Sequence, residues 1–125
     1  MYEKVTTLQQ FSFVCTPAPF QKAVLAGLDY DMSDQYASYK QKRDLTYDLL
    51  KDTFDVVKPQ GAFYIFPKVP QGTDMDFVQA AVNKNVLIVP GSACSRKNTH
   101  FRMSFAVEDE QLIKGIEILK KIAYE

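Results

Sequence analysis

The chain has 125 residues, enough for one ordinary domain, and its 46% hydrophobic and 24% charged residues are typical of a globular protein. Its 15 basic and 15 acidic residues give a formal net charge of zero without a basic block, so nucleic-acid binding is not expected. The apolar runs are too short to span a bilayer and the amino terminus lacks a signal-peptide core, so we expect no membrane attachment.

Cysteine and histidine, two common ligands of transition metals, are scarce in this chain. Cys15 and Cys94 lack the spacing of metal ligands, and His100 is the only histidine. A disulfide between the two cysteines is one interpretation, but free thiols in a cytoplasmic protein are the more common arrangement. A Cys94–His100 catalytic pair has only nearness in sequence to support it. The sequence therefore predicts no metal site and a cytoplasmic location.

The first elements are marked by prolines. Phe11, Phe13 and Val14 alternate with Ser12, which indicates either a short extended segment or the end of a longer element. Proline fits the first turn of a helix, where a missing N–H costs nothing. We therefore expect a helix after Pro17 and Pro19 with an apolar stripe made of Phe20, Val24 and Leu28.

Three further helices are expected from caps and apolar periodicity. One begins near Ser33 and Asp34, a second is capped by Thr73 or Asp74, and the last begins at Glu108 and Asp109. The residues expected to be buried on the first are Tyr36, Tyr39, Leu49, Leu50 and Phe54. The second carries Phe77, Val78, Ala81 and Val82 on one face, and the apolar residues of the last are Leu112, Ile113, Ile116, Leu119 and Ile122.

Three strands are expected between these helices. Residues 62–66 are rich in strand-forming side chains and are followed by Pro67, which indicates a sheet edge or a strand end. Residues 86–89 resemble a buried strand, and residues 101–105 alternate between apolar and polar side chains. The element order predicts an α/β (α+β) fold, a two-layer sandwich of a small sheet covered by helices.

Four segments follow one another along the chain: residues 16–23 (TPAPFQKA), residues 39–50 around YKQKRD, residues 59–66 (PQGAFYIF), and VPGS at 89–92 followed by FRMSFA at 101–106. In this order they resemble the class I/II aminotransferases, which are pyridoxal-phosphate-dependent enzymes of fold type I. The resemblance depends on all four segments occurring in this order. The part of the family that they resemble is the carboxyl-terminal small domain of an enzyme similar to aspartate aminotransferase.

The resemblance implies roles for two residues. Arg102 matches the family arginine that binds the α-carboxylate of the substrate, and a guanidinium fork suits a carboxylate because two parallel hydrogen bonds can form. Phe63 lies in a segment that approaches the substrate side chain in the family, which makes it a candidate wall of the side-chain pocket. Packing in the core is the alternative for Phe63 and the more common role of such an aromatic.

The resemblance also implies that the large and small domains of the parent enzyme have different roles. The family holds pyridoxal phosphate on a lysine of the large domain, in a Ser-x-Ser-Lys motif that this sequence does not contain. We therefore expect a carboxyl-terminal fragment without transaminase activity or bound cofactor of its own. Residues 1–28 would be a remnant of the large domain with the hinge helix, and residues 29–125 the small domain. The expected partners are amino-acid and 2-oxo-acid substrates, and a second subunit in a homodimer of the parent enzyme.

Two other functions are compatible with the residues. A small α/β sandwich of this size could act as a free-standing ligand-binding module without catalysis. A pyridoxal-phosphate-dependent carbon–sulfur lyase would share the carboxylate-binding arginine, because it too must orient an amino acid.

Overall fold

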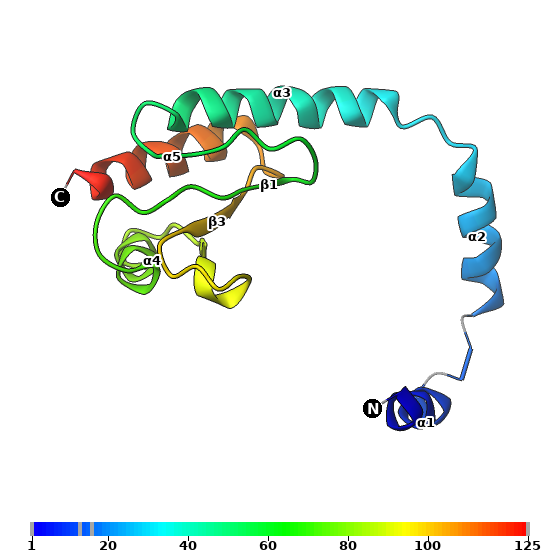
Figure 1. Cartoon of the computed structure of the whole chain (residues 1–125). Coiled ribbons are helices and arrows are strands. Elements are labelled where there is room, and N and C mark those ends of the chain that lie inside the picture. The colour runs from blue at the N-terminus through cyan, green and yellow to red at the C-terminus, as the bar shows by residue number, and fades with distance from the viewer. Residues whose placement is uncertain (1, 13, 16, 125) are drawn as a thin grey trace. The chain divides into compact units, whose positions relative to one another are not determined.

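The computed structural model of the chain describes residues 2–12, 14–15 and 17–124. Phe13 and Thr16, which entered the expectations above, lie outside the described residues. The chain divides into two units, residues 1–33 and residues 34–125. The second unit contains the sheet and the hydrophobic core, and Figure 1 shows its ribbon from α3 to the carboxyl end.

Two helices make up the first unit. Helix α1 (Tyr2–Ser12) contradicts the extended interpretation of residues near Phe11, and helix α2 (Ala18–Leu28) confirms the helix expected after the prolines. Pro17 caps α2, and proline also occupies its first turn, as the missing N–H allows. Neither helix buries a described side chain, so the apolar stripe of α2 with Phe20, Val24 and Leu28 is exposed.

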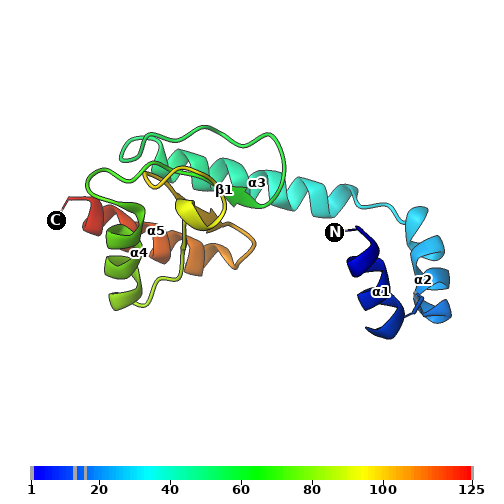
Figure 2. The same ribbon diagram turned by 60° about the horizontal axis from the view of Figure 1, so that its bottom comes forward.

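The long helix α3 (Ser33–Leu50) opens the second unit, which includes all of the helix except its first residue. Its last turns bury Thr46 and Leu50, but Tyr36 is 72% exposed and Tyr39 is also exposed, so burial of these two tyrosines was a wrong prediction. The reason is visible in Figures 1 and 2, where the first turns of α3 extend past the sheet that would have covered them.

The sheet has three short strands in the order β1-β3-β2. Strand β3 (Phe101–Ser104) is central, with β1 (Tyr64–Ile65) and β2 (Val89–Pro90) antiparallel on either side. Strand β1 is shorter than the expected 62–66 because Ala62 has a φ of 60°, which is not an extended conformation. The edge position of β1 and its end before Pro67 confirm the interpretation of that proline.

Residues 86–88 are not the buried strand that the sequence predicted. Leu87 is 85% exposed, and only Val89 of that run belongs to β2. Asn85 has a φ of 62°, and the Val86 N–H donates to Ala81 at the end of helix α4 (Asp74–Asn83), so the chain is still leaving the helix. Strand β3 has four residues, and its pairs with β2 lie at Val89 and Pro90.

Helices cover the inner face of this sheet and close the core. Helix α5 (Asp109–Ala123) lies beside α3 in both ribbon views, and the Lys42 ammonium joins the two by contacts with the Asp109 carboxylate (2.6 Å) and the Val107 carbonyl (2.7 Å). The core between the layers consists of Leu50, Phe54, Ile65, Val69, Phe77, Ala81, Ile88, Phe101, Met103, Phe105, Leu112, Ile116, Leu119 and Ile122. The expected sandwich of a small sheet and helices is confirmed.

Candidate functional site

Strand β3 carries a polar row on the face turned away from the core. Phe101 and Met103 are buried, while Arg102 and Ser104 between them are half-buried. Because side chains of a strand alternate between faces, this pattern confirms the two-faced strand that the sequence predicted. Arg102 therefore lies at the centre of the sheet, opposite Val89 of β2, with its side chain on the outer face.

The Arg102 guanidinium rests on an aromatic ring. Its Cζ lies 4.6 Å from the centroid of the Tyr64 ring, and among the described residues Arg102 forms no ion pair with a carboxylate. Arg43 on α3 is different, because its Nη2 lies 2.6 Å from the Asp44 carboxylate. An arginine held over a ring keeps its N–H donors available for an anion such as a substrate carboxylate.

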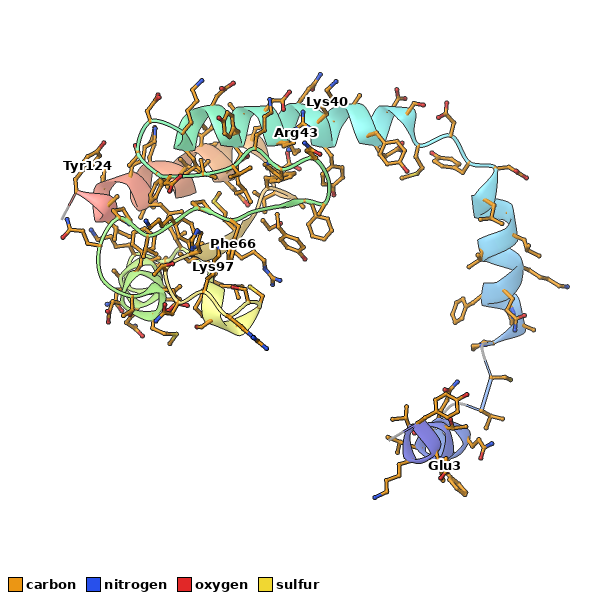
Figure 3. The ribbon with its side chains drawn as sticks, in the orientation of Figure 1. Glu3, Lys40, Arg43, Phe66, Lys97 and Tyr124 are labelled. Carbon is orange, nitrogen blue, oxygen red and sulfur yellow. The ribbon has the colours of Figure 1, made fainter. Side chains whose placement is uncertain are left out.

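Aromatic side chains continue from Tyr64 to helix α3. The Phe63 and Tyr64 rings lie 4.2 Å apart between centroids, and Tyr39 lies 6.5 Å from Phe63. Phe63 is 42% exposed, so its alternative role in the core is wrong. It lines an open hollow of about 480 Å³ between α3 and the loop before β1, and Figure 3 shows two of the other lining residues, Lys40 and Arg43, on α3.

The turn after β2 is fixed by a buried carboxylate that sequence reasoning missed. Asp74 accepts hydrogen bonds from the Ser92 N–H (2.8 Å), the Ser92 hydroxyl (2.6 Å) and the Met75 N–H (3.0 Å). The Ser92 hydroxyl, and then the Ser92 N–H, lower the pKa of Asp74, which keeps the carboxylate charged. The cap position of Thr73 was a sequence signal, but the reach of Asp74 to Ser92 depends on the fold.

The turn after β2 needs a glycine at position 91, because a side chain there would clash with the backbone. A Cβ at this position would lie 2.5 Å from the His100 carbonyl oxygen and 2.6 Å from the Lys97 carbonyl oxygen. The close approach lets the Gly91 N–H donate to the His100 carbonyl at 2.8 Å, which ties the turn to the residue before β3. The segment after β2 is therefore fixed by Asp74 of α4 through Ser92 and by His100, directly before β3, through Gly91.

Within the residues that it describes, the structure does not bring a catalytic partner to Cys94. Cys94 is exposed, and its sulfur lies 3.8 Å from the Pro90 carbonyl oxygen. The His100 ring instead contacts the Thr99 hydroxyl at 3.0 Å and stacks on Phe66 at 5.1 Å between centroids. These contacts involve residues other than Cys94 and give no support to a Cys94–His100 pair.

The described residues offer no clear group for binding a metal ion or pyridoxal phosphate. No group of three or more His, Cys, Asp or Glu side chains could hold a metal ion among the described residues. Every lysine that the structure describes is exposed or half-buried, which does not fit the enclosed lysine that binds pyridoxal phosphate. None of the described helices is long and apolar enough to cross a membrane.

Comparison with known proteins identifies the family. The family model of class I and II aminotransferases matches residues 3–119. The chain belongs to this family. The match covers most of the chain and favours an enzyme family over a free-standing ligand-binding module.

Individual relatives agree with this assignment. A probable aspartate aminotransferase of Methanocaldococcus jannaschii is 37% identical over 92% of this chain, and a probable N-acetyl-LL-diaminopimelate aminotransferase of Bacillus subtilis is 34% identical over 93%. The crystal structure of Thermotoga maritima aspartate aminotransferase superposes with a TM-score of 0.86 at 31% identity, covering 97% of this chain. This chain covers 32% of each of the three proteins, so it spans about a third of their length.

Proposed function

We propose that this chain serves a pyridoxal-phosphate-dependent aminotransferase by binding the α-carboxylate of the amino-acid substrate, and that Arg102 is the residue that binds it. The observation that carries this proposal is the position of Arg102, at the centre of the sheet's outer face and without a carboxylate partner among the described residues. A guanidinium so placed offers two parallel N–H donors to a carboxylate.

Such a contact would orient the substrate. A carboxylate held by two hydrogen bonds from a strand has little freedom to rotate, so the bonds at the substrate Cα take a fixed direction. The exposed and half-buried lysines described above do not fit attachment of pyridoxal phosphate. We therefore assign substrate binding to this chain and leave the bond-making chemistry to a cofactor-bearing domain.

The two parts of the chain are assigned different roles by analogy with the large and small domains of the family. Residues 29–125 would act as the small domain that closes over the substrate and excludes water, and residues 1–28 would pack with the cofactor-bearing domain and the hinge. The exposed apolar stripe of α2 supports this packing, because such surfaces are commonly covered by a partner. The parent enzyme would act as a homodimer on an amino acid and a 2-oxo acid.

Phe63 is proposed as one wall of the pocket for the substrate side chain. Its exposure, its place in the hollow beside α3 and its contact with the Tyr64 ring support this role. Since Tyr64 lies under Arg102, a substrate carboxylate at Arg102 would be close to this aromatic row. Phe63→Ala in the enzyme would then change the KM ratio between an aromatic and a small amino acid, and an unchanged ratio would argue against the role.

Transfer of an amino group is preferred over carbon–sulfur bond cleavage. The relatives named above are aminotransferases, and this supports the choice. The chain by itself is expected to be inactive. Added pyridoxal phosphate should give no stable internal-aldimine absorbance that an amino acid removes, and such a band would contradict this expectation.

A chimeric enzyme tests the proposed function directly. In Thermotoga maritima aspartate aminotransferase, the segment that matches this chain would be replaced by residues 1–125. The chimera should transaminate L-aspartate, and the same enzyme without the segment should not. A chimera that is folded, dimeric and loaded with pyridoxal phosphate, yet inactive with a panel of amino acids, would contradict the proposal.

A further inference from the structure

We propose that Tyr64 is a positioning residue that sets the orientation of the Arg102 guanidinium, an inference that rests on the carboxylate-binding role proposed above. The guanidinium Cζ lies 4.6 Å from the centroid of the Tyr64 ring. Within the described part of the chain, this ring is the cation–π partner of Arg102, and no carboxylate forms an ion pair with the arginine.

Strand register brings the two side chains together. Tyr64 pairs with Ser104 across the antiparallel β1–β3 ladder, and Arg102 is two residues from Ser104 on the same face. Diagonal neighbours on one face of such a pair are about 7–8 Å apart at Cα, which is within reach of an aromatic ring and a long side chain. The register of the sheet therefore places the Tyr64 ring within reach of the Arg102 guanidinium.

The chemistry of a ring suits this task better than that of an acid would. A ring face attracts a cation through its quadrupole but offers no lone pair in the direction of the cation. The donors of the guanidinium stay available for a ligand. Arg43 shows what an acidic partner does instead. Its Nε–H donates to the Asp44 carboxylate at 2.7 Å, so this donor is no longer available for a ligand.

Tyr64 is itself held in place from the side. The Phe63 ring lies 4.2 Å from it at an interplanar angle of 41°, and Phe63 in turn contacts Tyr39 of α3 at 6.5 Å between centroids. Backbone pairing with β3 fixes the other end of the residue. The row Tyr39–Phe63–Tyr64 thus connects Arg102 to the helix layer.

The test measures the order of the arginine side chain in the full 125-residue chain by ¹⁵N relaxation of the Arg102 Nε–Hε group. Tyr64→Leu should lower its heteronuclear NOE toward that of exposed Arg96, while Tyr64→Phe, which keeps the ring, should retain the wild-type value. Tyr47→Leu is the matched control, because it removes the ring 5.6 Å from Lys58 Nζ, a cation–π pair that does not involve Arg102. Tyr64→Val is a second ring-free variant in case the leucine variant does not fold.

A carboxylate titration separates this inference from the proposed function. Propionate, with propionamide as the uncharged control, should shift the Arg102 Nε–Hε signal, and loss of the ring should weaken that binding about 2- to 5-fold. Unchanged Arg102 order in both ring-free variants would overturn the positioning role, as would a loss in Tyr64→Phe equal to that in Tyr64→Leu. If the ring-free variants loosen Arg102 but propionate never shifts its signal, the contact is supported and the carboxylate role fails.

Discussion

At the scale of single residues, Gly91 decides whether the turn beside the arginine strand can form. A methyl group there would meet the carbonyl oxygens of His100 and Lys97, which are backbone atoms that cannot rotate away. Gly91→Ala should therefore lower the free energy of unfolding by about 3 kcal/mol, measured by urea denaturation of the chain.

Gly115 provides the matched control for this prediction. It lies on α5, and a Cβ at its position would meet nothing within 4 Å. Gly115→Ala should raise the free energy of unfolding by about 0.5–1 kcal/mol because alanine loses less backbone entropy in a helix. Equal effects of the two substitutions would show that the turn is not as closely packed as the structure indicates.

His100 should make stability depend on pH in a known direction. Burial, followed by the nearby Lys97 and Lys68 cations, lowers the pKa of His100 below its ordinary value of 6.5, although Asp55 opposes the shift. The unfolded chain then binds more protons, so stability is fully present above the ordinary pKa and falls as the pH drops through it. The free energy of unfolding should decrease between pH 7.0 and pH 5.5.

A ring without a titratable nitrogen isolates the effect of His100, the only histidine of the chain. His100→Phe keeps an aromatic partner for Phe66 and should flatten the dependence on pH over the same range. An equally steep dependence in the variant would assign the proton uptake to other groups.

The alternation of Phe101 and Met103 with Arg102 was enough to predict on which face of β3 the arginine lies. Its contact with Tyr64 could not be predicted, because it depends on the register in which β1 pairs with β3. The Asp74–Ser92 hydrogen bonds join residues 18 positions apart and likewise depend on the fold. Local patterns therefore predicted the face of the strand on which Arg102 lies, but not the residues that contact it or fix the neighbouring turn.

At the scale of elements, helix α5 shows how far periodicity predicts burial. Of the apolar residues that the sequence placed on this helix, Leu112, Ile116, Leu119 and Ile122 are buried, whereas Ile113 at the border of the apolar stripe is 37% exposed. Leu119→Ala should lower the free energy of unfolding by about 2–5 kcal/mol because it leaves a cavity in the core. Ile113→Ala should cost less than about 1 kcal/mol, and both are measured by urea denaturation.

The ranking of these two variants is the decisive outcome. A larger loss for Ile113→Ala than for Leu119→Ala would place a different face of α5 against the sheet. Either result is independent of catalysis, so the packing of the small domain is tested separately from its function.

Short strands were harder to predict than helices. The apolar run at residues 86–89 has strong strand-forming side chains, yet β2 begins only at Val89 because the preceding residues are still leaving α4. Conversely, α1 lacked a clear apolar stripe and its sequence was compatible with an extended segment. Whether such a segment forms a strand depends on pairing with another part of the chain, and the position of that partner cannot be read from a single sequence.

At the scale of the whole molecule, the order of four short motifs identified the fold that the structure and the comparisons support. The small sheet, with its inner face covered by α3, α4 and α5, leaves the outer face with Arg102 for a ligand. Under the proposed function, this outer face binds the substrate carboxylate.

The most direct measurement is kcat/KM for the amino-acid substrate in the chimeric enzyme, with Arg102→Ala compared with Arg96→Ala. Loss of two charge-assisted hydrogen bonds should reduce kcat/KM about 100-fold or more for Arg102→Ala, with Arg102→Lys in between because it keeps charge without the planar fork. Arg96 is exposed, and its alanine variant should stay within about 2-fold of the chimera, as expected for a surface substitution. If Arg102→Ala also stays within about 2-fold, the arginine does not bind the substrate carboxylate and the account is wrong.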